Sequence, residues 1–442
     1  NGRQRLLMFK PGEGEGRYGA HLLPGGAAML LTEGAFSNVG PNPDAIEIPH
    51  ISVVLLATGE KRTLIERGAD ARYVSTGHVV YAVDGTLFGV RFDLERLQIV
   101  GAPVPLLEGV RRSNATPAAQ YSLSSNGSLV YVAGSALADL TMALLDRQGG
   151  VTRLKVPNAS YLLPRFSPDG KQVAVEIDNA STSDIWIYDL SGAHAMRQLT
   201  LGGRNRFPVW SRDGKSVAFS SDRAGDVAVW QTLADGSGSA ERVTTPEAGI
   251  AFTPLSWHPR EQTLLMNRYS QGRLRGASAL WTYSVTERKA SPVAGVESEQ
   301  PITAEFSPDG RWIAYHTSST IDGSARSTVF VKPYPATDAL YRIDAGGQPV
   351  WSQNGMELFY ARATQLLVTT LTTSPSFANS VPSALPTIRA ASFYRNYDVS
   401  ADGTRILAIV PALSANAGDS TRPRIEVVLN WSEELKRLLP AE

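Results

Sequence analysis

The sequence predicts an all-β fold: a β-propeller of four-stranded antiparallel blades, with about eight or nine blades. Three observations carry this prediction. A tight-turn motif recurs nine times along the 442 residues, and an alternating apolar and aromatic run follows most copies. No segment keeps a 3.6-residue apolar period, apart from a short helix suggested at 431–439.

The repeat is most legible at Phe166-Ser-Pro-Asp-Gly170 and Phe306-Ser-Pro-Asp-Gly310. Proline presets φ, aspartate bonds its own backbone, and glycine adopts positive φ without strain, so the motif is a tight turn. A spacing of roughly 40–50 residues suits either a propeller blade or a helical HEAT-type unit. Turn chemistry and β-branched runs favour the blade. The motifs are centred near residues 25, 76, 126, 169, 213, 259, 309, 354 and 402, and the copy at 257–260 is degenerate.

Further strands follow each hairpin. Third strands are expected at 183–189, 226–230, 279–284 and 328–331, and more polar fourth strands at 195–200 and 240–244. Four antiparallel strands, graded from apolar to polar, are typical of a blade. We therefore expect residues 1–442 to form one propeller repeat region, with two partial rings as the alternative. Ring closure is expected between residues 5–9 and 425–430.

Composition narrows the possible functions. Lys+Arg and Asp+Glu both total 42, so no net positive charge favours nucleic acid. The absence of cysteine excludes disulfides, thiolate metal ligands and a cysteine nucleophile. No apolar run is long enough to cross a membrane, so no membrane segment is predicted. The abrupt start at Asn1 suggests a mature or truncated fragment of a longer protein.

The Phe-Ser-Pro-Asp-Gly repeats resemble those of TolB-like propellers. More specifically, the segments 68–81, 84–88, 92–97, 103–110 and 427–431 resemble the extracytoplasmic propeller region of bacterial membrane-bound serine/threonine protein kinases. This resemblance implies a sensor or interaction module in the periplasm or outside the cell. The kinase itself is absent from the sequence, which has no glycine-rich loop, His-Arg-Asp or Asp-Phe-Gly motif.

Candidate ligand-binding residues lie in the loops that lead into the innermost strands, because those loops form one face of a propeller around its channel. Arginine, tyrosine and other interface-prone types occur there. The candidates are Tyr161, Arg204, Arg206, Phe252, Glu299, Gln348, Arg395 and Asn396. The recurring turn aspartates, such as Asp169 and Asp309, are interpreted as turn formers and not as ligands.

No catalytic residue is predicted. The sequence lacks a Gly-x-Ser-x-Gly elbow, and its six histidines form no His-x-His or His-Glu-x-x-His pair. The leading hypothesis is a non-catalytic extracytoplasmic module without a cofactor that binds a protein, a small molecule or a carbohydrate. One alternative is a propeller lyase or hydrolase with a metal such as calcium or manganese in the central channel. The other is a structural subunit of an extracellular assembly.

Overall fold

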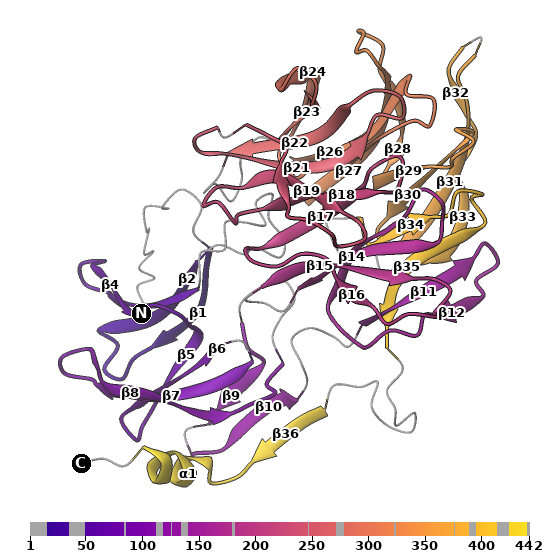
Figure 1. The fold of residues 1–442 in the computed structure, drawn as a ribbon. Helices are drawn as coiled ribbons and strands as arrows, with labels where there is room; N and C mark the ends of the chain where they lie inside the picture. The colour runs from indigo at the N-terminus through magenta and orange to yellow at the C-terminus, as the bar shows by residue number, and fades with distance from the viewer. Residues whose placement is uncertain are drawn as a thin grey trace. The chain divides into compact units, whose positions relative to one another are not determined.

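The structure is a computed structural model, and its strands are labelled in Figure 1. It describes residues 16–34, 49–83, 85–111, 118–124, 126–133, 140–178, 182–245, 247–270, 278–321, 324–374, 376–388, 395–412 and 424–439. These residues form 36 strands and one helix, and the strands make nine antiparallel sheets. The all-β propeller prediction is confirmed, with nine sheets for nine turn motifs.

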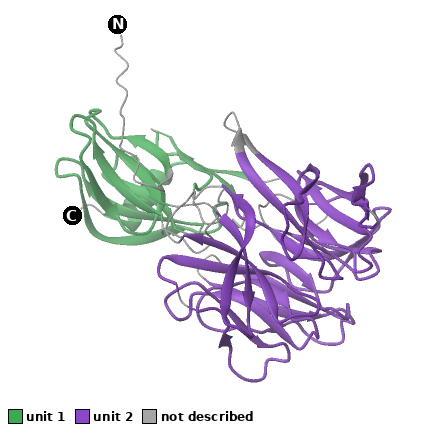
Figure 2. Ribbon diagram, turned by 90° about the horizontal axis from the view of Figure 1, so that it is seen from above, with its two compact units in different colours: residues 1–39, 45–138, 413–442 green, residues 40–44, 139–412 purple. Residues whose placement is uncertain are grey.

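The chain divides into two compact units, coloured separately in Figure 2. Unit 1 comprises residues 1–39, 45–138 and 413–442, and unit 2 comprises residues 40–44 and 139–412. The candidate site described below lies entirely in unit 2.

Unit 2 contains six of the nine sheets. The first three are β13(Tyr161–Phe166)–β14(Gln172–Asp178)–β15(Ser183–Asp189)–β16(Arg197–Gln198), β17(Asn205–Trp210)–β18(Ser216–Ser221)–β19(Ala228–Leu233)–β20(Glu241–Arg242) and β21(Ile250–Trp257)–β22(Thr263–Ser270)–β23(Ser278–Ser284)–β24(Lys289–Ser298). The next two are β25(Ala304–Phe306)–β26(Trp312–Ile321)–β27(Ser324–Pro333)–β28(Tyr341–Ala345) and β29(Gly347–Trp351)–β30(Glu357–Arg362)–β31(Gln365–Thr372)–β32(Ala378–Asn379), with β33(Ser383–Thr387) also on β31. The sixth is β12(Val151–Arg153)–β11(Leu140–Asp146)–β35(Arg405–Pro411)–β34(Tyr397–Val399).

The six sheets of unit 2 form a closed ring. Each innermost strand lies beside the next in the order β13, β17, β21, β25, β29 and β34, and β34 lies beside β13 again. Apolar clusters fill the spaces between successive sheets, for example the one containing Met142, Tyr161 and Val173. The two inner strands of the sixth sheet come from the end of this unit and its two outer strands from the beginning, so the ends of the unit are held together by main-chain hydrogen bonds.

Unit 1 contains the other three sheets and the helix. The sheets are β1(Gly16–Leu22)–β2(Ala28–Gly34)–β3(His50–Leu55)–β4(Lys61–Ile65), β5(Ala69–Val74)–β6(His78–Val83)–β7(Thr86–Asp93)–β8(Gln98–Leu107) and β9(Tyr121–Leu123)–β10(Leu129–Ala133)–β36(Arg424–Val428). The predicted terminal helix is α1(Trp431–Leu438), and its buried Trp431 and Leu435 pack into an apolar cluster of this unit.

Two half-blades exchange their outer strands. In the sequence, β11 and β12 follow β9 and β10 and would complete the same blade. Instead β11 pairs with β35, and β36 takes the place beside β10. Residues 5–9, expected to close a ring with 425–430, lie outside the described residues. The described partner of β36 is β10.

The turn motif explains why these sheets form. Ser167 Oγ donates a hydrogen bond to Asp169 Oδ1 at 2.7 Å. The same carboxylate oxygen also accepts a hydrogen bond from the Lys171 N–H. The same pair recurs at Ser400 and Asp402, where the serine hydroxyl lowers the pKa of the aspartate to about 2. In the degenerate copy the His258 ring takes over this role by accepting two turn N–H groups, so the blade keeps its hairpin.

A β-bulge recurs in the inner strands. The register shifts in β13, β17 and β29, and the shifts coincide with positive φ at Leu163, Phe207 and Gln348. Each of these residues precedes a proline, which donates no ladder hydrogen bond and is therefore suited to a bulge. Because a bulge re-aims side chains, it decides which residues point toward the middle of the ring.

Candidate functional site

A cavity lies among the innermost strands of unit 2. Its apolar lining includes Leu163 and Phe207, both placed by the bulges, together with Ile302. Counting the part open to solvent, about 530 Å³ is free of protein atoms, but the centre of a water molecule fits in only about 30 Å³. Since one water needs roughly 10–15 Å³ by that measure, the enclosed part of the cavity has room for about two or three water-sized groups.

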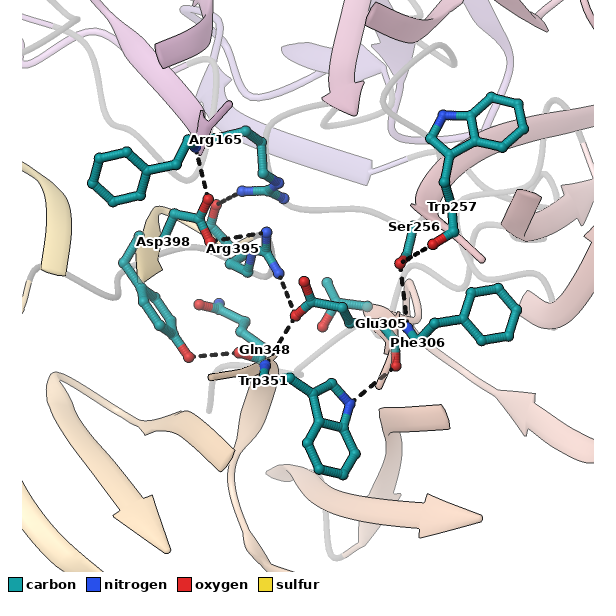
Figure 3. A network of polar contacts seen from close by, with 12 residues as sticks. Arg165, Ser256, Trp257, Glu305, Phe306, Gln348, Trp351, Arg395 and Asp398 are labelled. Carbon is teal, nitrogen blue, oxygen red and sulfur yellow. Dashed lines mark hydrogen bonds and ion pairs between the residues drawn. The ribbon is translucent and has the colours of Figure 1, made fainter. Parts of the chain in front are cut away.

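A charged network lies at this cavity, drawn in Figure 3. Arg395, which is 6% exposed, bonds Glu305 Oε2 at 3.1 Å and Asp398 Oδ1 at 3.2 Å. Burial alone would lower the pKa of Arg395, but the two carboxylates raise it. Burial raises the pKa of Glu305, and Arg395 opposes that rise. Arg395 is therefore a fixed cation that links two sheets.

The two carboxylates also join neighbouring sheets (Figure 3). Glu305 Oε2 accepts the Trp351 N–H at 3.1 Å, and Asp398 Oδ2 accepts the Phe166 N–H at 2.8 Å. Ser256 makes the equivalent bond to the Phe306 N–H. Each of these three acceptors is the next-to-last residue of its innermost strand, so this position links three of the six sheets to the next one.

Arg165 occupies the same repeat position but carries a positive charge. It donates to the carbonyls of Pro164 at 2.8 Å and Arg395 at 3.3 Å, and its buried Nε has no hydrogen-bond partner among the described residues. Within the part of the chain that the structure describes, no carboxylate forms an ion pair with Arg165. Burial, and secondarily the charge of Arg395, lowers the pKa of Arg165 to about 9. An anion brought to this guanidinium would stabilise its charged form.

Neutral polar groups complete the lining. Asn267 on β22 is 2% exposed, and its Oδ1 has no hydrogen-bond partner among the described residues. Thr303 donates its hydroxyl to His316 Nδ1 at 2.8 Å, and that nitrogen also accepts the N–H groups of Thr303 and Gln348. Burial lowers the pKa of His316 to about 4, so the ring is neutral near pH 7. The cavity thus offers a guanidinium donor and an amide acceptor.

Arg206, another predicted residue, is held in a separate buried pair. It is 3% exposed and bonds Glu176 Oε1 at 2.8 Å, and Glu176 is fully buried. Ser183 donates to the same carboxylate at 3.0 Å, and the Phe207 N–H donates at 3.3 Å. Burial raises the pKa of Glu176, partly opposed by Arg206. This pair connects β14 to β17.

The structure places the other predicted residues as follows. Among the eight candidates, Arg395 lines the cavity, and Gln348 and Asn396 lie beside it: the Gln348 carbonyl accepts the Tyr397 hydroxyl, and Asn396 Oδ1 accepts the Leu163 N–H. The remaining positions lie elsewhere. Tyr161 and Phe252 are buried in apolar clusters, the Arg204 N–H bonds Asp222, and Glu299 is exposed after β24.

Sequence reasoning missed Arg165, Asn267 and Thr303. A signal for Arg165 existed, since it is the charged residue directly before the repeated Phe-Ser-Pro-Asp-Gly. The inner-strand prolines at 164, 208 and 349 also marked the bulges. Asn267 and Thr303 had no such signal, because their approach to the cavity depends on pairing between strands.

Two further structural findings bear on function. No group of three or more His, Asp or Glu side chains that could hold a metal ion occurs among the described residues. Within the same residues, no helix has the length and apolar character needed to span a membrane.

Comparison with known proteins assigns the repeat. Residues 144–332 match the TolB β-propeller domain. Over these residues the chain carries a TolB-like β-propeller domain. No curated protein sequence matches it.

Solved structures with a similar fold include one described as TolB from Agrobacterium tumefaciens, at 15% identity and a TM-score of 0.47, covering 62% of this chain and 98% of that one. TolB from Acinetobacter baumannii has 17% identity and a TM-score of 0.40, with 69% and 78% covered. An oligogalacturonate lyase from Vibrio parahaemolyticus has 9% identity and a TM-score of 0.36, with 66% and 96% covered.

Proposed function

We propose that this TolB-like propeller is a non-catalytic, extracytoplasmic binding module that recognises a protein partner at the cavity of unit 2. The observation that carries the proposal is the cavity among the innermost strands, lined by charged and polar groups such as Arg165 and Asn267 that the repeat itself does not require. A TolB-like domain supports a binding role in general terms. We also propose that this protein is located in the periplasm or outside the cell.

The proposed role is that of a sensor in an envelope receptor, as implied by the resemblance to the extracytoplasmic regions of membrane-bound kinases. A propeller suits sensing because its closed ring holds the cavity rigid while the non-repeating side chains vary. The fixed Glu305–Arg395–Asp398 network supports this rigidity, since its bonds connect four successive sheets, those of β25, β29, β34 and β13.

Site-specific photo-crosslinking tests the proposal. The photoreactive amino acid p-benzoylphenylalanine would replace Phe207, which lines the cavity, or Val151 on the outer strand β12 as a matched control. Irradiation in a bacterial envelope fraction is expected to give a discrete cross-linked protein from position 207 and none from position 151. Identical products from both positions, or none from either, would refute a binding role for the cavity.

A further inference from the structure

The Arg165 guanidinium has no carboxylate partner at ion-pair distance among the described residues. A buried or half-buried charge is normally paired, because removing it from water is costly. Arg395 meets this expectation with two carboxylates at 3.1 and 3.2 Å. Arg165, on β13, bonds only carbonyl oxygens among the contacts of the described residues.

We infer that the cavity of unit 2 binds a carboxylate group of a peptide, held by Arg165 and oriented by Asn267; this rests on the proposed binding function. A guanidinium prefers a planar carboxylate, since two parallel N–H donors match its two oxygens. Asn267 Oδ1, buried and without a partner among the described residues, needs a donor such as the N–H of the same peptide. Both side chains line one cavity.

The size of the cavity favours a single group over a larger ligand. The space of about 30 Å³ for the centre of a water molecule suits a carboxylate that replaces a few waters. The apolar side chains Leu163 and Phe207 beside it would cover the methylene groups that lead to the carboxylate. This fits the end of an acidic side chain or a peptide carboxyl terminus.

The acidic residues of the network do not compete for Arg165 at ion-pair distance. Glu305 Oε2 is taken by Arg395 and the Trp351 N–H, and the two Asp398 oxygens are taken by Arg395 and the Phe166 N–H. Their charges are therefore already stabilised by charged and main-chain donors. Asp398 and Glu305 act on the Arg165 charge only from beyond ion-pair distance, and a ligand carboxylate would add a directly bonded counter-charge.

Calorimetric titration of the full chain with small capped amino acids tests the inference. The probes are N-acetyl-glutamate amide for a side-chain carboxylate, N-acetyl-alanine for a terminal carboxylate, and the neutral N-acetyl-glutamine amide and cationic N-acetyl-lysine amide as controls. We expect at least one carboxylate probe to bind in the millimolar range and both controls to bind more weakly, by about tenfold or more. Whichever carboxylate binds better identifies the source of the group.

Variants locate the binding. Arg165→Gln is expected to weaken binding of the carboxylate probe by about ten- to a hundredfold, and Asn267→Leu is expected to weaken it by a smaller factor. The exposed Arg212→Gln is the matched control and should bind normally. Circular dichroism checks folding, and the comparison of glutamate and glutamine probes in the unmodified protein needs no variant.

The inference is wrong if neither carboxylate probe binds, if the glutamine probe binds as tightly as the better carboxylate probe, if the lysine probe binds best, or if folded Arg165→Gln binds that carboxylate probe like the unmodified protein. In each of those cases a persisting cross-link from position 207 would leave the proposed binding role intact and remove only the carboxylate as its ligand.

Discussion

The buried imidazole of His316 should make unit 2 sensitive to mild acid. Its Nδ1 accepts N–H groups of Thr303 and Gln348 and the Thr303 hydroxyl, so a proton added there would face three donors. Burial lowers the pKa of His316 from 6.5 to about 4 in the folded chain. Between these values the unfolded chain binds the proton and the folded chain does not, so stability falls as the pH drops from 6.5 toward 4.

The size of the effect follows from that difference. Each pH unit across the window corresponds to about 1.4 kcal/mol, so His316 should cost about 3 kcal/mol of the free energy of unfolding by pH 4. No further loss from this group is expected below pH 4, where both states are protonated.

Urea unfolding at a series of pH values measures this effect. His316→Asn keeps an acceptor near Thr303 without a titrating ring, and the exposed His194→Asn is the matched control. The difference between the unmodified protein and His316→Asn isolates the histidine, because all other titrating groups are common to both. The reasoning is refuted if that difference stays constant between pH 6.5 and 4, or if His194→Asn changes the pH dependence equally.

Three other predictions concern the fold. Arg206→Met should lower the free energy of unfolding by roughly 3–5 kcal/mol, because it leaves the Glu176 carboxylate buried without its cation; urea unfolding that shows less than about 1 kcal/mol would contradict this. Asp402→Asn should lower thermal stability at pH 7 and flatten its decline between about pH 4 and pH 2, because the folded pKa of about 2 lies below the unfolded value and the ionised carboxylate therefore stabilises the folded chain above that range; an unaltered decline in calorimetric scans would contradict this prediction. Thr141→Cys with Val410→Cys, in a chain that otherwise lacks cysteine, should form a disulfide between β11 and β35 on mild oxidation, and failure to cross-link on a denaturing gel would argue against this ring closure.

Much of the fold could be predicted from local sequence. The Pro-Asp-Gly turns fix hairpins through bonds within six residues, such as Gln172 N–H to Ser167 Oγ. Consequently the predicted third strand at 183–189 matches β15, and the predicted helix at 431–439 matches α1 to within one residue. These elements depend on near neighbours only.

The exchange of outer strands could not be predicted in the same way. Both β11 and β36 are apolar strands that could follow either half-blade, and nothing local distinguishes Leu144 opposite Leu407 from a partner on β10. That choice depends on contacts across more than 250 residues of sequence, which alternation of apolar residues does not encode.

The candidate site was predictable only in part. Arg395 was predicted because it lies in a non-repeating loop before β34. Arg165 was missed because it directly precedes the repeated turn motif, whose residues were interpreted as structural. The difference between them is electrostatic: Arg395 has two carboxylate partners and Arg165 has main-chain partners. The sequence alone does not show which arginine has carboxylate partners in the folded chain and which is available to bind a ligand.

The most direct test is a crystal structure of the full chain grown with the carboxylate probe that binds more tightly. We expect a closed ring of six sheets in residues 139–412, with density for the carboxylate against the Arg165 guanidinium. A cavity that holds only water while the probe lies elsewhere, or an Arg165 paired with a carboxylate of the chain itself, would contradict the inferred binding.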